Sequence, residues 1–284
     1  MVSVQQSPAN VAPERGTTYD AVVIGAGFAG MYMLHRLRDL GMSARVYEQG
    51  DDVGGTWYWN RYPGARCDSE SVYYMLSDHF SNEILQEWTW TERFAAQPEI
   101  LRYLQFVADK MDLRRDIQFG TRVTSAVWDE ARNRWEIGTD AGDQVSAKFL
   151  ITTVGCLSTP FTPSYKGLET FQGTWYHSAH WPDEGVDFTG ERVAVIGTGA
   201  TAVQIVPEVA KQAAHLYVFQ RTPSHNIPGR NHPLDADYVR ELKENYSKIW
   251  EKARETGFGF PFEIPQRSAL DVSPEERERI YNAA

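Results

Sequence analysis

The sequence predicts an α/β fold with two Rossmann-like dinucleotide-binding units, joined by a linker and followed by a helical C-terminal extension. An apolar run of strand length, a glycine-rich turn, a helical pattern and a second short strand occur at 19–48 and return at 192–221. The two copies lie too far apart for a solenoid repeat, so they indicate two nucleotide-binding units. Prolines and scattered glycines between 155 and 190 are typical of a connection.

This pattern divides the chain into five expected segments: a flexible tail at 1–18, a first domain at 19–155, a linker at 156–190, a second Rossmann unit at 191–234 and a truncated helical subdomain at 235–284. In the first domain we expect a helix at 98–110 and a small sheet built from 117–128, 133–138 and 144–154. Residues 51–80 read as an ordered excursion without helix or strand. No third strand-turn-helix pattern follows residue 235, so we expect the fold to be incomplete in this chain.

Composition narrows the class of protein. A formal net charge of -10 argues against a nucleic-acid partner, because affinity for phosphate backbones comes from clustered Lys and Arg. No apolar run reaches the roughly 18 residues that would span a membrane, and no secretory signal begins the chain, so we expect a cytoplasmic protein without a membrane partner. The two cysteines, Cys67 and Cys156, form no CxxC, which excludes a disulfide framework, a zinc knuckle and a dithiol redox pair.

The first glycine motif follows a strand and opens a helix. Its glycines allow a tight turn, close approach of a pyrophosphate and close packing of helix on strand. Glu48 ends the second strand, where an acid can accept hydrogen bonds from ribose hydroxyls, so we expect this domain to bind FAD. The motif residues are Gly25, Gly27, Phe28, Ala29 and Gly30.

The second glycine motif has Arg221 where the first has its acid. A carboxylate there would repel a 2′-phosphate, whereas a guanidinium can bind one through two hydrogen bonds, so this site is expected to prefer NADPH. The alternative is that Arg221 is only a surface charge. The expected contacts are Gly197, Thr198, Gly199, Ala200, Thr201, Ala202, Gln220, Arg221 and Thr222.

Two such sites in one chain are what hydride transfer from NADPH to a bound flavin requires. Disulfide reductases share that combination, but they need a CxxC beside the flavin, and this sequence has none.

Two further motifs identify a family. Residues 54–68 match the pattern GGxWxxxxYPGxxxD, and the linker matches FxGxxxHxxxWP at Phe171, Gly173, His177, Trp181 and Pro182. From about residue 18 to its end the chain resembles the Baeyer-Villiger monooxygenases of the phenylacetone and cyclohexanone type. The resemblance implies that FAD, NADPH and O₂ insert one oxygen atom next to a ketone carbonyl through a C4a-peroxyflavin, which gives an ester or lactone.

The resemblance also implies roles for individual residues. Asp68 would be catalytic, close to the flavin ring and the nicotinamide, where it helps to hold an active-site arginine. His177 would position the linker for NADPH binding and would not carry protons. Further FAD contacts would be Gly55, Thr56, Trp57, Tyr58, Trp59, Asp68, Tyr74 and Val123, and further NADP contacts Arg66, Cys67 and Asp68.

The arginine of the family lies beyond Ala284, so we expect a fragment whose partner is a missing C-terminal half or a complementing chain. Two different functions stay open beside ketone oxidation: an N- or S-oxygenating flavin monooxygenase, or a nucleotide-binding remnant or subunit without turnover. Asp68 could instead form a loop-stabilising ion pair with Arg61 or Arg66. His177 and His180 have no acidic or Cys partner at ligand spacing, so no metal is expected.

Overall fold

The computed structural model describes residues 16–224, 226, 228–257, 259–260, 267–268 and 270–283. The chain forms two compact units, at 1–235 and 236–284. The first fifteen residues of the predicted tail lie outside the described residues. The tail prediction is wrong at its end, because Gly16 already donates a backbone hydrogen bond to Gln144 and the first strand, β1, begins at Thr18.

A six-stranded sheet organises the first part of the chain, in the order β3-β2-β1-β6-β5-β4. β1 pairs in parallel with β2 and β6, and its residues 21–23 are fully buried. A continuous apolar run is expected of such a strand, because both faces of a parallel sheet are covered. The strands are β1 (Thr18–Ile24), β2 (Ala44–Tyr47), β3 (Ile117–Gln118), β4 (Val123–Asp129), β5 (Arg134–Thr139) and β6 (Gln144–Thr152).

The prediction of a separate small sheet at 117–154 is corrected. β4, β5 and β6 form an antiparallel meander, but β6 is long enough to pair with β5 through Ala147 and with β1 through Thr152. The meander is therefore continuous with the main sheet.

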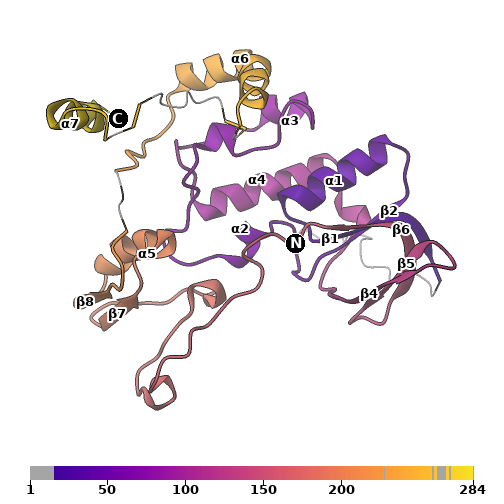
Figure 1. Ribbon diagram of the computed structural model, residues 1–284, viewed down its shortest axis with the longest axis horizontal. Coiled ribbons are helices and arrows are strands. Elements are labelled where there is room, and N and C mark those ends of the chain that lie inside the picture. Colours follow the sequence, from indigo (N-terminus) through magenta and orange to yellow (C-terminus); the bar gives the residue numbers. More distant parts are fainter. Residues whose placement is uncertain are drawn as a thin grey trace, which may run out of the picture. The chain divides into compact units, whose positions relative to one another are not determined.

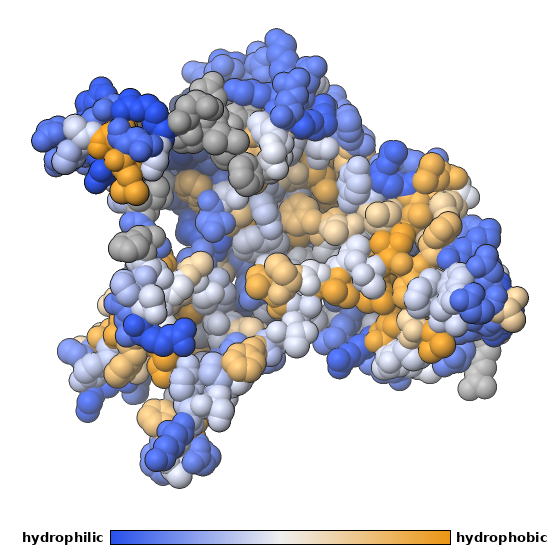
Figure 2. All heavy atoms as spheres, viewed as in Figure 1, coloured by the Kyte–Doolittle hydropathy of each residue, from blue (hydrophilic) through white to orange (hydrophobic). Residues whose placement is uncertain are grey.

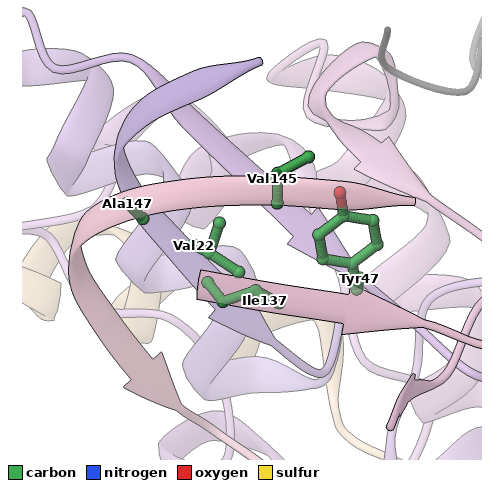
Figure 3. Close-up of a cluster of buried hydrophobic side chains, with 5 residues drawn as sticks. All are labelled: Val22, Tyr47, Ile137, Val145 and Ala147. Atoms are coloured by element: carbon green, nitrogen blue, oxygen red, sulfur yellow. The ribbon is translucent and has the colours of Figure 1, made fainter. Parts of the chain in front are cut away.

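The parallel strands and the meander share one hydrophobic core. One core cluster joins Val22 of β1, Tyr47 of β2, Ile137 of β5, and Val145 and Ala147 of β6 (Figure 3). Figure 1 shows the helices α1 (Phe28–Asp39) and α4 (Gln97–Lys110), which the glycine motif and the predicted helix at 98–110 anticipate. Their buried residues include Met31, Leu34, Ile100, Tyr103, Leu104 and Val107, which recur at helical spacing.

The excursion at 51–80 contains short helical turns that the sequence did not lead us to expect. They are α2 (Thr56–Trp59) and the 3-10 turn η1 (Ser71–Tyr73). After them come the short helix α3 (Asn82–Glu87) and, beyond α4, the 3-10 turn η2 (Arg114–Asp116). The linker likewise holds two 3-10 turns, η3 (Leu168–Thr170) and η4 (Ser178–His180).

The second glycine motif lies in a smaller group of secondary-structure elements. β7 (Arg192–Ile196) and β8 (His215–Phe219) form a two-stranded parallel sheet, connected by the helix α5 (Ala200–Ala210). Apolar side chains lie exposed on these strands, and Figure 2 shows them at the surface. Ile196 and Phe219 are 62% and 55% exposed. The two strands therefore leave apolar side chains exposed.

The unit at 236–284 contains two helices, as predicted, and its other described residues form turns or irregular structure. α6 (Ala236–Arg254) buries a stripe formed by Leu242, Tyr246, Trp250 and Ala253, which is the spacing of one helix face. α7 (Pro274–Ala283) completes the elements. In the described part of the chain, no helix is long and apolar enough to cross a membrane.

Candidate functional site

The first glycine turn lies where β1 ends and α1 begins. Gly25 has a φ of 101° and donates its N–H to Tyr47 at 2.8 Å. The Thr153 hydroxyl donates to the carbonyls of Ile24 and Gly25, at 2.8 and 3.0 Å. A Cβ on Gly30 would overlap the Gly25 carbonyl oxygen. The first and third glycines are therefore required by packing within the protein.

The start of α1 is suited to an anion. Gly27 is its N-cap, with no side-chain cap and no acidic residue in the first turn. The first N–H groups of a helix have no partner within it, and they carry partial positive charge. Backbone N–H groups from Phe28 to Gly30 can thus meet a pyrophosphate.

Glu48 lies beside this turn, with only 5% of the residue exposed. One carboxylate oxygen accepts from the Ala26 N–H at 2.7 Å, and the other accepts from the Gly50 N–H at 2.8 Å. Both contacts fix its orientation at the end of β2. Because a carboxylate has about four acceptor positions, it retains capacity for hydroxyl donors.

The turn at Gly54 and Gly55 crosses the first glycine turn. Gly54 donates its N–H to Ala26 at 3.1 Å, and a Cβ on Gly55 would lie 2.9 Å from the Gly27 Cα. Gly55 has a φ of 53°. Because Gly27 and Gly55 both lack a side chain, their backbone segments can touch, which places α2 beside the start of α1.

Aromatic side chains cluster next to this crossing. The Trp57 indole N–H donates to the Tyr74 hydroxyl at 3.2 Å, and the Phe28 and Tyr74 rings meet edge to face at 5.2 Å. The Gln97 amide donates to the Trp57 carbonyl. Burial raises the pKa of Tyr74, and the nearby Asp68 contributes to that rise. The phenol thus keeps its proton, and among the described residues no acceptor receives it.

The arginines near Asp68 are committed elsewhere. Arg61 pairs with Asp183 at 2.6 Å, and Arg66 pairs with Glu92 at 3.5 Å. Asp68 is exposed, and no described side chain forms a hydrogen bond or ion pair with its carboxylate. The alternative of an ion pair between Asp68 and Arg61 or Arg66 is therefore wrong for the described residues.

Cys67 precedes Asp68 in the same loop, and its side chain is turned into the protein. It is buried, and its backbone N–H donates to Ala95 at 3.1 Å. Burial raises the pKa of the Cys67 thiol to about 11. A thiol in that state is unreactive at neutral pH, which argues for a packing role.

The other predicted residues of this part lie as follows. Thr56 and Trp59 are exposed on α2, whereas the Tyr58 hydroxyl accepts from the Asp51 N–H at 3.1 Å and holds the loop. Val123 is partly buried at the start of β4, packed against the core cluster.

The second glycine turn has a different relation to its surroundings. Gly197 has a φ of 112°, and Gly199 is the N-cap of α5, again without a side-chain cap or an acid in the first turn. A Cβ on either glycine would meet no described atom within 4 Å. Packing within the protein therefore does not require a glycine at 199. Close approach of a ligand to the backbone would require one.

Arg221 belongs to the segment after β8, which is hydrogen-bonded to this turn. The Thr198 hydroxyl donates to the Thr222 carbonyl at 3.3 Å, which joins the glycine turn to the segment after β8. Arg221 and Gln220 are exposed, and in the described part of the chain no carboxylate pairs with Arg221. A guanidinium in this state can receive a phosphate.

The linker motif is explained by local packing. The Phe171 ring lies over Gly173, where a Cβ would be 2.7 Å from the ring. The Nδ1 atom of His177 accepts from the Ala179 N–H at 3.2 Å, and its Nε2 atom lies 3.2 Å from the Phe161 carbonyl. Both ring nitrogens are thus engaged by backbone. The described residues contain no group of three His, Cys, Asp or Glu that could hold a metal.

Trp181 continues the same packing. Its ring lies 5.7 Å from the Tyr176 ring and 6.1 Å from the Phe188 ring. The end of the motif, at Trp181 and Pro182, is therefore held by aromatic neighbours within the linker.

Three residues with structural roles at the site could not be singled out from the sequence. Thr153 supports the first glycine turn, Gln97 joins α4 to the loop at Trp57, and Gln204 of α5 bonds the loop before Asp68. Only Gln204 had a usable signal, since it is an amide among the apolar residues of its helix.

Comparisons with known proteins identify the family of this chain. The family described as flavin-binding monooxygenase-like matches residues 19–240. A Baeyer-Villiger monooxygenase of Pseudooceanicola batsensis is 46% identical over 270 residues, which cover 95% of this chain and 49% of that protein. A phenazine N-monooxygenase of Lysobacter antibioticus is 43% identical over 266 residues, covering 93% and 49%. A solved steroid monooxygenase bound to NADP is 53% identical with a TM-score of 0.88, covering 94% and 51%. The chain spans about half the length of these relatives.

Proposed function

Because this chain belongs to the flavin-binding monooxygenase-like family, we propose that it binds FAD at the first glycine turn and NADPH at the second, and that it serves in Baeyer-Villiger oxidation of ketones. The predicted cytoplasmic location and the domain boundaries at 19–155, 156–190 and 191–234 belong to the same proposal.

One observation carries the assignment of the nucleotides. Two helices begin at uncapped glycines after parallel strands, and the groups beside them differ in charge. At the first helix, the buried carboxylate of Glu48 accepts hydrogen bonds from ribose hydroxyls. At the second, the exposed guanidinium of Arg221 receives the 2′-phosphate that distinguishes NADPH from NADH.

The bound cofactors supply hydride transfer and the activation of O₂. The chain binds and orients them. The start of α1 holds one pyrophosphate, and the start of α5 holds the other. The hydrogen-bonded, edge-to-face rings of Trp57 and Tyr74 form an aromatic wall beside the first site, which would limit the access of water. The Asp68 carboxylate, which has no partner among the described residues, can orient a cation or an amide that comes near the reacting atoms.

The fingerprint of the linker favours ketone oxidation over oxidation at nitrogen or sulfur. Its Trp-Pro ending at Trp181 and Pro182 is the feature in which the related N- and S-oxygenating enzymes generally differ. The similarity to a phenazine N-monooxygenase makes N-oxygenation the second candidate.

Product analysis separates these functions. Purified chain is supplied with FAD, NADPH and O₂, and with cyclohexanone, a tertiary aromatic amine or an aryl sulfide in turn. Lactone from cyclohexanone supports the proposal. N-oxide or sulfoxide without lactone supports the second candidate, and binding of both nucleotides without oxygen consumption supports a nucleotide-binding remnant or subunit without turnover.

A further inference from the structure

The loop between Arg61 and Asp68 contacts a helix far away in the sequence. Gln204, on α5, reaches into this loop from the second nucleotide unit. It lies about one and a half helical turns beyond the glycine N-cap, Gly199, at which the proposed NADPH site begins. One side chain thus stands between the two nucleotide sites.

Gln204 uses both ends of its amide. Its carbonyl oxygen accepts from the Tyr62 hydroxyl at 2.9 Å and from the Arg66 N–H at 3.3 Å, and its NH₂ group donates to the Arg66 carbonyl at 2.9 Å. The donor and acceptor on Arg66 belong to the same residue, so the amide satisfies that peptide segment in the way a neighbouring strand would. All three residues are partly buried.

A glycine allows this close approach. Gly64 has a φ of 79°, and a Cβ there would overlap the backbone carbonyl of Gln204. The backbone of the loop therefore lies directly on the backbone of α5. The Tyr-Pro-Gly sequence at 62–64 is what this contact requires, because Tyr62 supplies the hydroxyl and Gly64 the room.

Few side chains could replace the amide of Gln204. Glutamate has the same shape, but its second oxygen would face the Arg66 carbonyl and repel it. Alanine would leave the partly buried N–H and C=O groups of Arg66 without partners, at a cost larger than the value of one hydrogen bond. Glutamine is thus the residue that both accepts and donates here.

We propose that Gln204 is a positioning residue that couples occupancy of the second nucleotide site to the placement of the loop carrying Asp68. A helix moves as a rigid body, so a nucleotide that orders the start of α5 also fixes Gln204. Gln204 in turn fixes Arg66, two residues before Asp68. This inference rests on the proposed function, since it needs FAD at the first site and NADPH at the second.

Coupling between two sites is reciprocal, so it can be measured by binding alone. The affinity for FAD is measured by flavin fluorescence, with and without saturating NADP⁺, on the 284-residue chain. In the unmodified chain NADP⁺ is expected to tighten FAD binding about tenfold, within the usual range for such coupling. Gln204→Ala and Gln204→Glu bring that ratio close to one, and Tyr62→Phe gives an intermediate ratio. Lys211→Ala, at the C-cap of the same helix, keeps it.

A second readout needs no cofactor. Trypsin cleaves after Arg61 and Arg66, and the loop is protected where it lies on α5. Gln204→Ala and Gln204→Glu are expected to be cleaved there about tenfold faster than Lys211→Ala, if the three hydrogen bonds hold the loop closed. Because Gln204→Glu preserves shape, it remains informative should Gln204→Ala fail to fold.

The outcomes separate the two hypotheses. If the unmodified chain binds both nucleotides but shows no coupling, or if Gln204→Glu keeps the full coupling ratio, the inference is overturned and the proposed function stands. If the chain binds neither nucleotide, the proposed function fails and the coupling with it. In that case equal cleavage rates of Gln204→Glu and Lys211→Ala would also overturn the structural contact.

Discussion

The substitution Gly199→Ala separates a glycine needed by a ligand from one needed by the fold. Gly199 is extended, with φ of −74° and ψ of −175°, and a Cβ there meets no described atom within 4 Å. A weaker N-cap costs roughly 0.5–1 kcal/mol, and the reduced freedom of the unfolded chain returns a similar amount, about 0.4–1 kcal/mol. The free energy of unfolding is therefore expected to change by less than about 1 kcal/mol.

Nucleotide binding responds differently to the same change. The new methyl group would lie where the pyrophosphate approaches the start of α5. Displacing the phosphate from one backbone N–H removes a hydrogen bond to a charged group, worth about 1.5–3 kcal/mol, which corresponds to at least about tenfold weaker NADP⁺ binding. Calorimetric titration with NADP⁺ and denaturant unfolding measure the two quantities on one sample.

Gly30→Ala provides the contrast, because its Cβ would overlap the Gly25 carbonyl oxygen. It is expected to lower the free energy of unfolding by about 1–3 kcal/mol, as overpacking does. A folded Gly199→Ala protein that binds NADP⁺ as tightly as the unmodified chain would refute the assignment of a phosphate to α5.

Two further predictions concern Glu48 and the thiols. Glu48→Gln replaces one of two carboxylate acceptors by a donor that faces a backbone N–H. It should lower the free energy of unfolding by about 2 kcal/mol and weaken FAD binding, whereas the exposed Glu130→Gln should do neither. Equal unfolding midpoints of these two variants would contradict this. With a pKa of about 11, the Cys67 thiol is only about one part in a thousand thiolate at pH 8, so a disulfide reagent should label the exposed Cys156 fast and Cys67 slowly. Burial raises the pKa of Cys67 above the ordinary thiol value of 9.0, so its contribution to stability is fully present below pH 9.0 and is lost as pH rises toward 11. In denaturant unfolding, Cys67→Ala should therefore lose less stability at alkaline pH than the unmodified chain.

The glycine turns and their flanking elements could be predicted from the sequence because their signals are local. A strand, a turn and a helix within one short segment determine where Gly25 and Gly199 lie, and the end of the next strand places Glu48. The partner of β6 could not be predicted in this way. Its apolar alternation is the same whether it pairs with β5 alone or with β1 as well.

The contacts that join segments were also beyond a sequence reading. Gln204 bonds to Arg66 across 138 positions, and Arg61 pairs with Asp183 across 122. Nothing in the residue types near Asp68 showed that both neighbouring arginines would be used elsewhere. That fact is what leaves its carboxylate free among the described residues.

The preference for NADP⁺ over NAD⁺ tests the central claim most directly. Calorimetric titration of both nucleotides into the unmodified chain and into Arg221→Gln measures the contribution of the guanidinium to 2′-phosphate binding. We expect that the unmodified chain prefers NADP⁺ by at least about tenfold, and that Arg221→Gln loses this preference while FAD affinity is unchanged. Equal affinities for NADP⁺ and NAD⁺ in the unmodified chain, or a preference that survives Arg221→Gln, would contradict it.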